Sequence, residues 1–390
     1  MEKILHSQYV RQPKFFKDFH CIGGKCKVSC CQFWCIDYKN SDVEKLKSAD
    51  CSEHLKALIS DSFEPYEDKM RIKLKGNGDC PFHNEDGLCS IQKELGEEYL
   101  SQVCVTYPRI SINLVGYVLR SCNITCPQVL SMICSDDDSM VLENHSLNGD
   151  VLKLVQTYSE LDMINNPSLK YTAVLFDFFY EILSDRSHSF ETSVVLGAMA
   201  AQKLDEFIKQ GKYDRIPEVI KALRPQMKNQ AQIEKLEQFK PNITLKANFA
   251  AGLLKFLNNS DVYQNIFENG VPSEEKINKG IAEFEKCYKG SVEYIRNIAL
   301  NLYITNKMPF REKKCSLFEN YSLFISEISV IKFLIPAISV QMSPADEKVA
   351  EAISIIDRSF SHDNVKFKRI LAYMKAFKCT SPAYLLGIIK

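Results

Sequence analysis

Residues 21–35 read CIGGKCKVSCCQFWC and hold five of the fifteen cysteines of this 390-residue chain. The other thiols are also unevenly spread, because twelve of the fifteen cysteines lie between Cys21 and Cys134. Thiols at this density serve disulfides, a metal or redox catalysis. The spacing of the cysteines and the cellular compartment distinguish these uses.

The start of the chain indicates which compartment applies. Its first residues, MEKILHSQYVRQPKFF, carry a charged or polar residue every few positions, so they lack the apolar segment of a secretory signal. We therefore expect a cytoplasmic protein. Thiols in a reducing compartment bind a metal more often than they form disulfides, so the sequence favours metal binding.

The thiols fall into three groups, and their spacing separates the metal types. Structural zinc sites usually take C-x2-C pairs and thiol-disulfide carriers need a reactive C-x-x-C, but the sequence contains no such pair. An iron-sulfur cluster accepts thiolates at irregular spacings, so the pattern favours iron-sulfur chemistry. The C-x3-C-x2-C spacing of radical S-adenosylmethionine enzymes begins at Cys26 and Cys30, yet Phe33 stands at the third position. The groups are Cys21, Cys26, Cys30, Cys31 and Cys35; Cys80 and Cys89; and Cys104, Cys122 and Cys126.

Charge and hydropathy exclude two classes of protein. The formal net charge is zero, and the first hundred residues hold 15 basic and 17 acidic residues, so we expect no nucleic-acid partner. The long apolar run 322–342 is interrupted by Glu327, Lys332 and Pro336, so it predicts a buried helix and no transmembrane segment. Peripheral association with a membrane stays open.

The length favours two or three domains, the cysteine distribution separates a cysteine-rich module from the rest, and the helical periodicity of the rest predicts a mainly α chain. Residues 1–135 form a cysteine-rich metal-binding module with little strand, in which capping patterns at Ser41 and Asp50 predict short helices. β-Branched and aromatic residues predict a strand pair over 110–119. The acidic, turn-rich segment 135–150 is the expected linker.

Residues 150–390 predict an irregular helical bundle. Apolar residues recur every three or four positions over 277–302, which indicates the buried stripe of a helix or helix pair. Residues 191–209 also predict a helix, which ends before Gly211, and Pro217 suits the start of the next one.

Longer stretches of the cysteine-rich module resemble a known family. The block CIGGKCKVSCC-x2-W, the stretch GDCPFHNEDGLCSIQKELGEEYLSQVCVTYPRI and the later Cys126-Pro127 are similar to the flagellin lysine-N-methylase family. That family shares its thiol pattern with a wider group of zinc- or iron-chelating cysteine-rich domains. The resemblance covers about residues 19–130, and its cysteine-proline-phenylalanine and tyrosine-proline-arginine signatures make it specific.

The resemblance implies a protein-lysine N-methyltransferase that uses S-adenosylmethionine, acts on flagellin and carries a cysteine-ligated 4Fe-4S cluster. Eight thiols match the family pattern, which is more than one cluster needs, so either two metal centres share them or four ligate and the rest pack. The alternative is a non-catalytic zinc- or iron-binding module on a helical protein-interaction domain. The matching thiols are Cys21, Cys26, Cys30, Cys31, Cys80, Cys89, Cys104 and Cys126.

Other residues have supporting roles. Lys25, Lys27 and Arg109 are candidates to stabilise thiolate charge, and His20 and His83 are candidates for a mixed site. The sequence contains neither a G-x-G-x-x-G nor a P-loop pattern, so no motif marks the catalytic residues or an S-adenosylmethionine pocket. The remaining thiols are expected to pack as small hydrophobic residues: Cys35, Cys51, Cys122, Cys134, Cys287, Cys315 and Cys379.

Overall fold

The computed structural model describes residues 9–26, 30–32, 36–146, 155–156, 158–256, 267–269, 271–338, 364–378 and 380–390. The chain forms two compact units. The cysteine-rich unit comprises residues 19–109 and 126–128, and the helical unit comprises residues 1–18, 110–125 and 129–390. Helices dominate the described residues, which confirms the predicted mainly α class.

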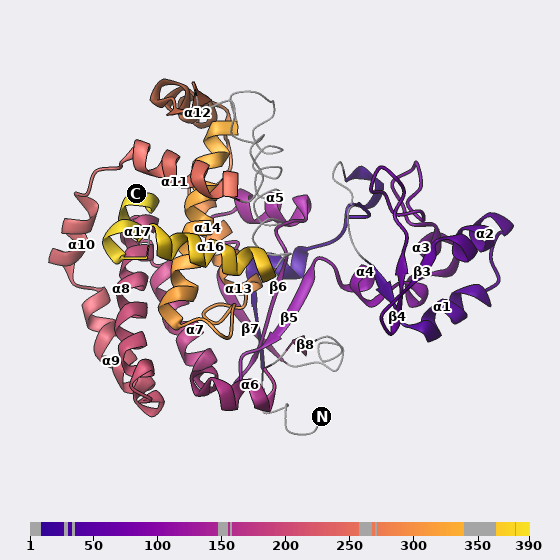
Figure 1. The fold of residues 1–390 in the computed structure, drawn as a ribbon, viewed down its shortest axis with the longest axis horizontal. Coiled ribbons are helices and arrows are strands. Elements are labelled where there is room, and N and C mark those ends of the chain that lie inside the picture. Colours follow the sequence, from indigo (N-terminus) through magenta and orange to yellow (C-terminus); the bar gives the residue numbers. More distant parts are fainter. Residues whose placement is uncertain are drawn as a thin grey trace. The chain divides into compact units, whose positions relative to one another are not determined.

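The cysteine-rich unit combines short helices with a small sheet (Figure 1). The sheet has the order β2-β4-β3 with antiparallel pairs, and the sequence did not predict it. The predicted short helices are confirmed as α1 and α2. The elements are η2 (Gly23–Lys25), β2 (Asp37–Tyr38), α1 (Asn40–Lys47), α2 (Glu53–Asp61), β3 (Phe63–Tyr66), β4 (Lys69–Ile72), α3 (Ser90–Leu95), η3 (Glu97–Tyr99) and α4 (Gln102–Thr106).

The caps of these helices differ from the prediction. Helix α1 begins at Asn40 without a side-chain cap, so Ser41 lies in its first turn and its hydroxyl contacts the adjacent Asp42 carboxylate. Helix α2 is capped by Ser52, whose Oγ accepts the N–H of Leu55 at 3.2 Å. The predicted caps at Ser41 and Asp50 are therefore wrong, because the helices begin at other positions than the capping patterns indicate.

One apolar cluster holds the cysteine-rich unit together. Phe63 belongs to this cluster, and the centroid of its ring lies 5.3 Å from that of Tyr38 in an edge-to-face contact and 5.9 Å from that of Phe82. The Cys80 thiol is part of this core, and other thiols pack against it, so the cysteines are fixed to the hydrophobic centre of the unit. The buried members are Ile36, Tyr38, Val43, Leu46, Leu55, Ile59, Phe63, Ile72, Cys80, Phe82 and Ile91.

The helical unit contains a five-stranded sheet of order β7-β1-β6-β5-β8. Strand β1 pairs parallel with β6 and antiparallel with β7, so segments far apart in sequence meet in one sheet. The predicted strand pair over 110–119 is confirmed as β5 and β6. The strands and the short helix after β1 are β1 (Tyr9–Pro13), η1 (Lys14–Asp18), β5 (Arg109–Asn113), β6 (Val118–Cys122), β7 (Leu142–Ser146) and β8 (Val155–Gln156).

This sheet changes how the chain is divided. Residues 9–18 and 110–125 belong to the helical unit, because their backbones pair within the same sheet as β7. The linker prediction for 135–150 is wrong over β7, whose residues pair with β1 from Leu142 opposite Pro13 to Ser146 opposite Tyr9. The polar residues of β7 are on an edge strand, which tolerates them.

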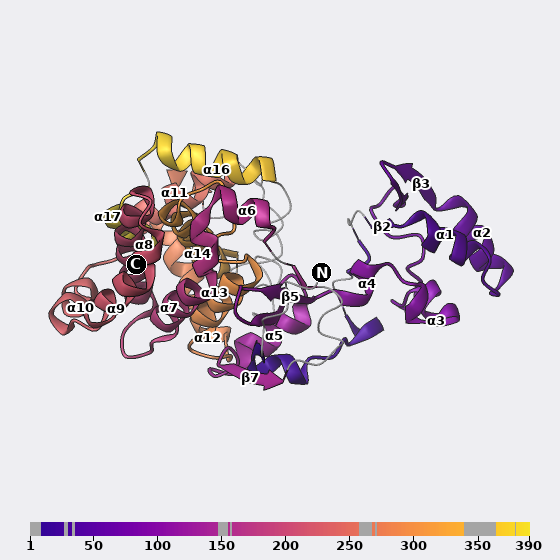
Figure 2. The same ribbon diagram turned by 90° about the horizontal axis from the view of Figure 1, so that it is seen from below.

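Helix α14 is the central element of the helical unit (Figures 1 and 2). It contacts α8, α11, α12, α13, α16 and α17. The helices are α5 (Pro127–Ser135), α6 (Glu160–Asn165), η5 (Pro167–Tyr171), α7 (Thr172–Ser184), α8 (Phe190–Lys209), η6 (Tyr213–Arg215), α9 (Ile216–Met227), α10 (Gln230–Glu237), α11 (Ile243–Phe256), α12 (Glu274–Cys287), α13 (Tyr294–Thr305), α14 (Leu317–Ile338), α16 (Asn364–Ala376) and α17 (Pro382–Ile389), with a short pair β9 (Phe267–Glu268) and β10 (Val271–Pro272).

The helix predictions in this unit are confirmed. Helix α8 covers the predicted range and is followed by Gly211 at φ +72°, a backbone conformation that favours glycine. Pro217 stands in the first turn of α9, and the stripe over 277–302 belongs to the helix pair α12 and α13. Among the helices in the described ranges, none combines the length and apolar composition of a membrane span.

Candidate functional site

Thiols from three segments of the cysteine-rich unit converge. Cys104 lies close enough to Cys30 and Cys89 for their charges to interact, and Cys80 is similarly close to Cys89 and Cys104. Cys30 also forms a side-chain hydrogen bond with its neighbour Cys31. We call Cys30, Cys31, Cys80, Cys89 and Cys104 the thiol cluster.

Backbone contacts bring the first two segments of the thiol cluster together. The N–H of Cys80 donates to the carbonyl of Cys31 at 2.8 Å. Next to this bond, Gln32 and Asp79 form an isolated β-bridge, and Gln32 Nε2 donates to Asp79 Oδ1 at 2.6 Å. Tyr38 on β2 lies beside the cluster, because its hydroxyl interacts with the third segment at Cys104. The cluster is therefore part of the folded core of the unit.

The Cys89 sulfur lies at a helix N-terminus. Cys89 is the N-cap residue of α3, and the nearby backbone N–H groups of Gln92 and Ile91 lower the pKa of its thiol against the larger effect of burial. These are N–H groups that a helix leaves without an internal partner at its first turn. Their partial positive charge stabilises a thiolate at this position.

The Cys80 and Cys104 sulfurs also accept hydrogen bonds. The backbone N–H of Phe82 donates to Cys80, and the Ser101 side chain bonds to Cys104. Ser101 is also the N-cap of α4, since its Oγ accepts the N–H of Cys104 at 3.3 Å. Hydrogen bonds to sulfur are how proteins support metal-bound thiolates and tune the potential of an iron-sulfur cluster.

The cluster nevertheless disfavours free thiolates. Burial raises the pKa of Cys80 to about 12 and that of Cys104 to about 11, and neighbouring thiols add to both shifts. Burial also raises the pKa of Cys89. The pKa of Cys30 is raised mainly by its hydrogen bond with Cys31 and, to a smaller extent, by burial. Several thiolates can coexist here only beside a cation, which is the chemistry of a metal site.

A close backbone contact joins the first cysteine loop to the loop before Cys89. A Cβ atom on Gly24 would lie 2.3 Å from the carbonyl oxygen of Asp86, and one on Gly87 would lie 2.9 Å from the Gly24 Cα. Only glycine permits this approach at Gly24, and Gly87 has φ +76°. The loop after Cys21 therefore packs against the second cysteine segment.

The structure brings together five of the eight predicted ligands in the thiol cluster. Cys21 is exposed and its sulfur accepts the N–H of Gly23 at 3.4 Å, while Cys26 and Cys126 are half-buried in the same unit. Among the residues with described positions, no three His, Cys, Asp or Glu side chains stand in a metal-holding arrangement. The cluster is thus an approach of thiols and not a formed coordination shell.

The predicted supporting residues have varied positions. Arg109 Nη2 donates to the Phe19 carbonyl at 3.3 Å, and its guanidinium lies 4.9 Å from the Phe19 ring centroid, so Arg109 fastens the segment that leads to Cys21. His83 forms a β-bridge with Cys89. The other candidates are Lys25 on η2, His20 on the exposed surface, and Lys27, which lies outside the described residues.

Two of the thiols predicted to pack as hydrophobic residues are buried in the helical unit. Cys122 and Cys134 are buried there. Cys51, in the cysteine-rich unit, and Cys315, in the helical unit, are half-buried. The side chains of Cys35, Cys287 and Cys379 lie outside the described residues.

The helical unit has a polar pocket of about 730 Å³, which we call the mixed-charge pocket. Four arginines and three carboxylates line it: Arg11, Arg186, Arg224, Arg296, Asp177, Glu181 and Asp185. None of these residues was predicted from the sequence. They come from β1, α7, α9 and α13 and the segment between α7 and α8, so no local motif marks them.

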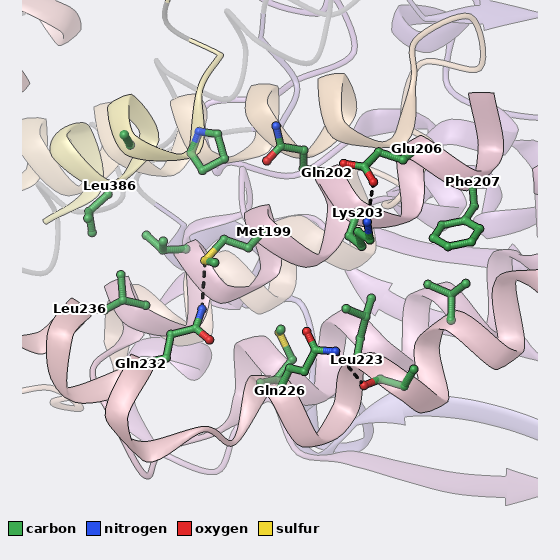
Figure 3. A pocket seen from close by; sticks show the side chains of 16 residues that line it. Met199, Gln202, Lys203, Glu206, Phe207, Leu223, Gln226, Gln232, Leu236 and Leu386 are labelled. Atoms are coloured by element: carbon green, nitrogen blue, oxygen red, sulfur yellow. Dashed lines mark hydrogen bonds and ion pairs between the residues drawn. The ribbon is translucent and has the colours of Figure 1, made fainter. Parts of the chain in front are cut away.

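A second cavity of about 550 Å³, the apolar groove, lies among α8, α9, α10 and α17 (Figure 3). Figure 3 shows Met199, Leu223, Leu236 and Leu386 around it. Its lining contains one ion pair, in which Lys203 Nζ lies 2.7 Å from Glu206 Oε2 on the same helix. None of its sixteen lining residues is His, Cys or Tyr, so the groove suits apolar contact and offers no thiol or imidazole for catalysis.

Known proteins are similar to this chain over most of its length. The profile of the FliB lysine N-methylase C-terminal domain matches residues 176–388. A protein named lysine-N-methylase from Salmonella typhimurium strain LT2 is 25% identical over 357 residues, which cover 84% of this chain and 85% of that protein. The flagellar biosynthetic protein FliU of Salmonella muenchen is 34% identical over 139 residues, or 34% of this chain and 81% of FliU. No solved structure matches.

Proposed function

This chain belongs to the FliB lysine N-methylase family, and we propose on that premise that it is a protein-lysine N-methyltransferase of the cytoplasm whose substrate is flagellin. We further propose that S-adenosylmethionine is the methyl donor and that the cysteine-rich unit holds an iron-sulfur cluster. The lysine-N-methylase of Salmonella typhimurium supports the reaction class, since the similarity extends over both units. The name of FliU supports a flagellar substrate.

The observation that carries the cofactor proposal is the thiol cluster. Its donor set fits an iron-sulfur cluster, because thiols from separate loops converge on one core, and Cys80 and Cys104 form hydrogen bonds with the Phe82 N–H and the Ser101 side chain. Cys30, Cys80, Cys89 and Cys104 would hold the cluster, since these four interact across the three segments. Such a cluster supplies electron transfer, or an open iron for ligands, when bound. Cys21, Cys26, Cys31 and Cys126 complete the proposed set of eight.

Methyl transfer requires a neutral lysine amine, because an ammonium nitrogen has no lone pair. The new N–C bond forms from that lone pair, the methyl–sulfur bond breaks with its electrons left on sulfur, and one proton leaves the nitrogen. The protein must therefore desolvate the incoming ammonium or provide a base. Products are the methylated lysine, the neutral thioether and a proton, so the reaction balances without an additional reductant.

The proposal is tested by incubating anaerobically purified protein with flagellin and S-adenosylmethionine labelled in its methyl group. We expect label on flagellin lysines, and none on flagellin whose lysines have been acetylated beforehand, because acetylation removes the amine lone pair. Stoichiometric zinc in the protein together with unlabelled flagellin would instead support a non-catalytic metal module.

A further inference from the structure

Three lysines of the helical unit lie near one another where α8, α11, α14 and α17 pack together. Lys246 of α11 interacts electrostatically with Lys332 of α14 and with Lys390, which follows α17. In the described part of the chain, Glu191 of α8 is the acidic residue that interacts with Lys246 in the same way. We call Lys246, Lys332 and Lys390 the lysine cluster.

Two members of the lysine cluster are held by partners within the protein. Lys332 forms an ion pair with Glu191. Lys390 Nζ donates to Ser189 Oγ at 3.2 Å and lies 3.3 Å from Glu237 Oε2. Both lysine side chains are largely buried. These contacts fix two positive charges beside Lys246, and the carboxylate of Glu191 is already paired with one of them.

Lys246 differs from the other two lysines. Its side chain is half-buried, and its Nζ forms neither a hydrogen bond nor an ion pair within the described ranges. It is not among the unpartnered side-chain atoms that are closed to solvent, so a small molecule can reach it. Burial, followed by the positive charge of Lys332, lowers the pKa of Lys246 to about 8. More of this amine is therefore neutral near pH 7 than is usual for lysine, and the neutral amine is the nucleophilic form.

The lysine cluster suits an anion that is bonded to Lys246 itself. An anion held without a covalent bond needs several free donors, but Lys332 and Lys390 are engaged by the protein. A covalent adduct needs only one accessible amine. Carbon dioxide is small and uncharged, so neither the half-burial of Lys246 nor the neighbouring ammonium groups keep it from this amine.

Carbon dioxide converts a neutral lysine amine into a carbamate. The Nζ lone pair forms a bond to the carbon, one carbon–oxygen π pair moves onto oxygen, and the nitrogen releases one proton to water, so no oxidant or reductant is needed. Lys246 lies in the first turn of α11, where the helix N-terminus favours a negative charge, as do the charges of Lys332 and Lys390. We propose that Lys246 is a carbamylation site, at which the protein binds carbon dioxide as a carbamate.

Chemical trapping on the anaerobically purified full chain tests this site. The protein is equilibrated with isotopically labelled carbon dioxide, an alkylating oxonium reagent converts carbamates into stable esters, and peptide mass spectrometry locates the label. We expect at least about tenfold more label on Lys246 than on Lys255, an exposed lysine of the same helix. Lys390→Gln should lower the label on Lys246 severalfold, because glutamine keeps a donor for Ser189 but removes one positive charge.

Carbon nuclear magnetic resonance of the labelled protein provides the matched control. The carbamate signal should be lost in Lys246→Arg and retained in Lys255→Arg, with an unchanged unfolding temperature in both variants. Equal label on Lys246 and Lys255, or a carbamate signal that persists in Lys246→Arg, overturns the proposal. An unchanged amount of label in Lys390→Gln overturns the role of the lysine cluster. None of these readouts depends on methyl transfer, so the proposed function is tested separately.

Discussion

The two units of this protein are stabilised in different ways. The cysteine-rich unit has one small apolar cluster, and thiols are among its members. The helical unit packs large side chains such as Phe176, Phe179, Tyr303 and Tyr321 around a long central helix. Because apolar burial supplies most of the folding free energy, the helical unit can fold on its own packing, whereas we expect the cysteine-rich unit to depend on metal.

This difference also separates two kinds of polar group. In the cysteine-rich unit, Cys80 and Cys104 are thiols that need a cation before they can ionise together. In the helical unit, the buried charges are already paired within the protein: Glu327 is fully buried and lies 2.7 Å from Arg311. Substitutions should therefore affect metal content in one unit and folding stability in the other.

Removing a thiol from the cluster should have the largest effect. Cys80→Ser replaces a buried member of both the core and the thiol cluster. Structural metal sites contribute on the order of 10 kcal/mol, so we expect the variant to lose its metal and the cysteine-rich unit to unfold, while the helical unit melts as before. Metal analysis together with calorimetric unfolding checks this.

Cys51→Ser is the matched control for Cys80→Ser. Cys51 is a half-buried thiol of the same unit that lies outside the family pattern. It should keep the metal and change the free energy of unfolding by less than about 1 kcal/mol. Equal metal loss in the two variants would contradict the assignment of ligands.

Breaking the buried ion pair should have the next largest effect, in the other unit. Arg311→Met leaves the Glu327 carboxylate with the Asn306 amide, which donates to it at 3.0 Å, but without its cation. We expect a loss of about 3–5 kcal/mol in the unfolding free energy of the helical unit. Denaturant unfolding measures this loss, and a reduced metal content would show that the two units are not independent.

Gly24→Ala tests the close contact between the two cysteine loops. The added Cβ would meet the backbone oxygen of Asp86 at 2.3 Å, so the loops must separate, at a cost of about 1–3 kcal/mol. We expect the metal to be lost faster to a competing chelator. Gly76→Ala is the control, because a Cβ there has no neighbour within 4 Å, and equal rates of loss in the two variants would contradict the role of the contact.

The smallest effect concerns Lys246, a half-buried lysine on α11. Burial, followed by the positive charge of Lys332, lowers its pKa to about 8 from 10.5. The folded state therefore binds fewer protons than the unfolded state between pH 8 and 10.5, so stability rises with pH across that window.

Lys246→Met removes this penalty. We expect it to stabilise the helical unit by roughly 1–2 kcal/mol at pH 7 and by progressively less as the pH rises from 8 to 10.5. Denaturant unfolding across this pH range measures the difference. A gain that is independent of pH would show that the ammonium is not desolvated in the fold.

Local sequence patterns predicted the helices of the helical unit. The strand pairings that were not predicted arise from long-range contacts. The apolar stripe over 277–302 and the helix boundaries marked by Gly211 and Pro217 are local signals. The helices that these signals predicted are present. The sheet that joins β1 to β6 and β7 arises from pairings across more than a hundred residues, which no short pattern records. The helix caps were misplaced because several nearby Ser and Asp residues compete for one role.

The two candidate sites differ in the same respect, because only one of them has a local signal in the sequence. Cysteines are rare enough in proteins that their clustering in sequence indicated a site, and five of the predicted thiols approach one another in the fold. The mixed-charge pocket is built from Arg11, Asp177 and Asn297, which are common residue types separated by most of the chain. Only the folded chain brings these residues together.

The central claim is that thiols from separate segments of the cysteine-rich unit hold an iron-sulfur cluster. The most direct test measures iron, acid-labile sulfide and zinc per chain in protein purified without oxygen. We predict about four irons and four sulfides per chain, as a 4Fe-4S cluster requires, with both lost in Cys80→Ser. One zinc per chain without sulfide would contradict the claim.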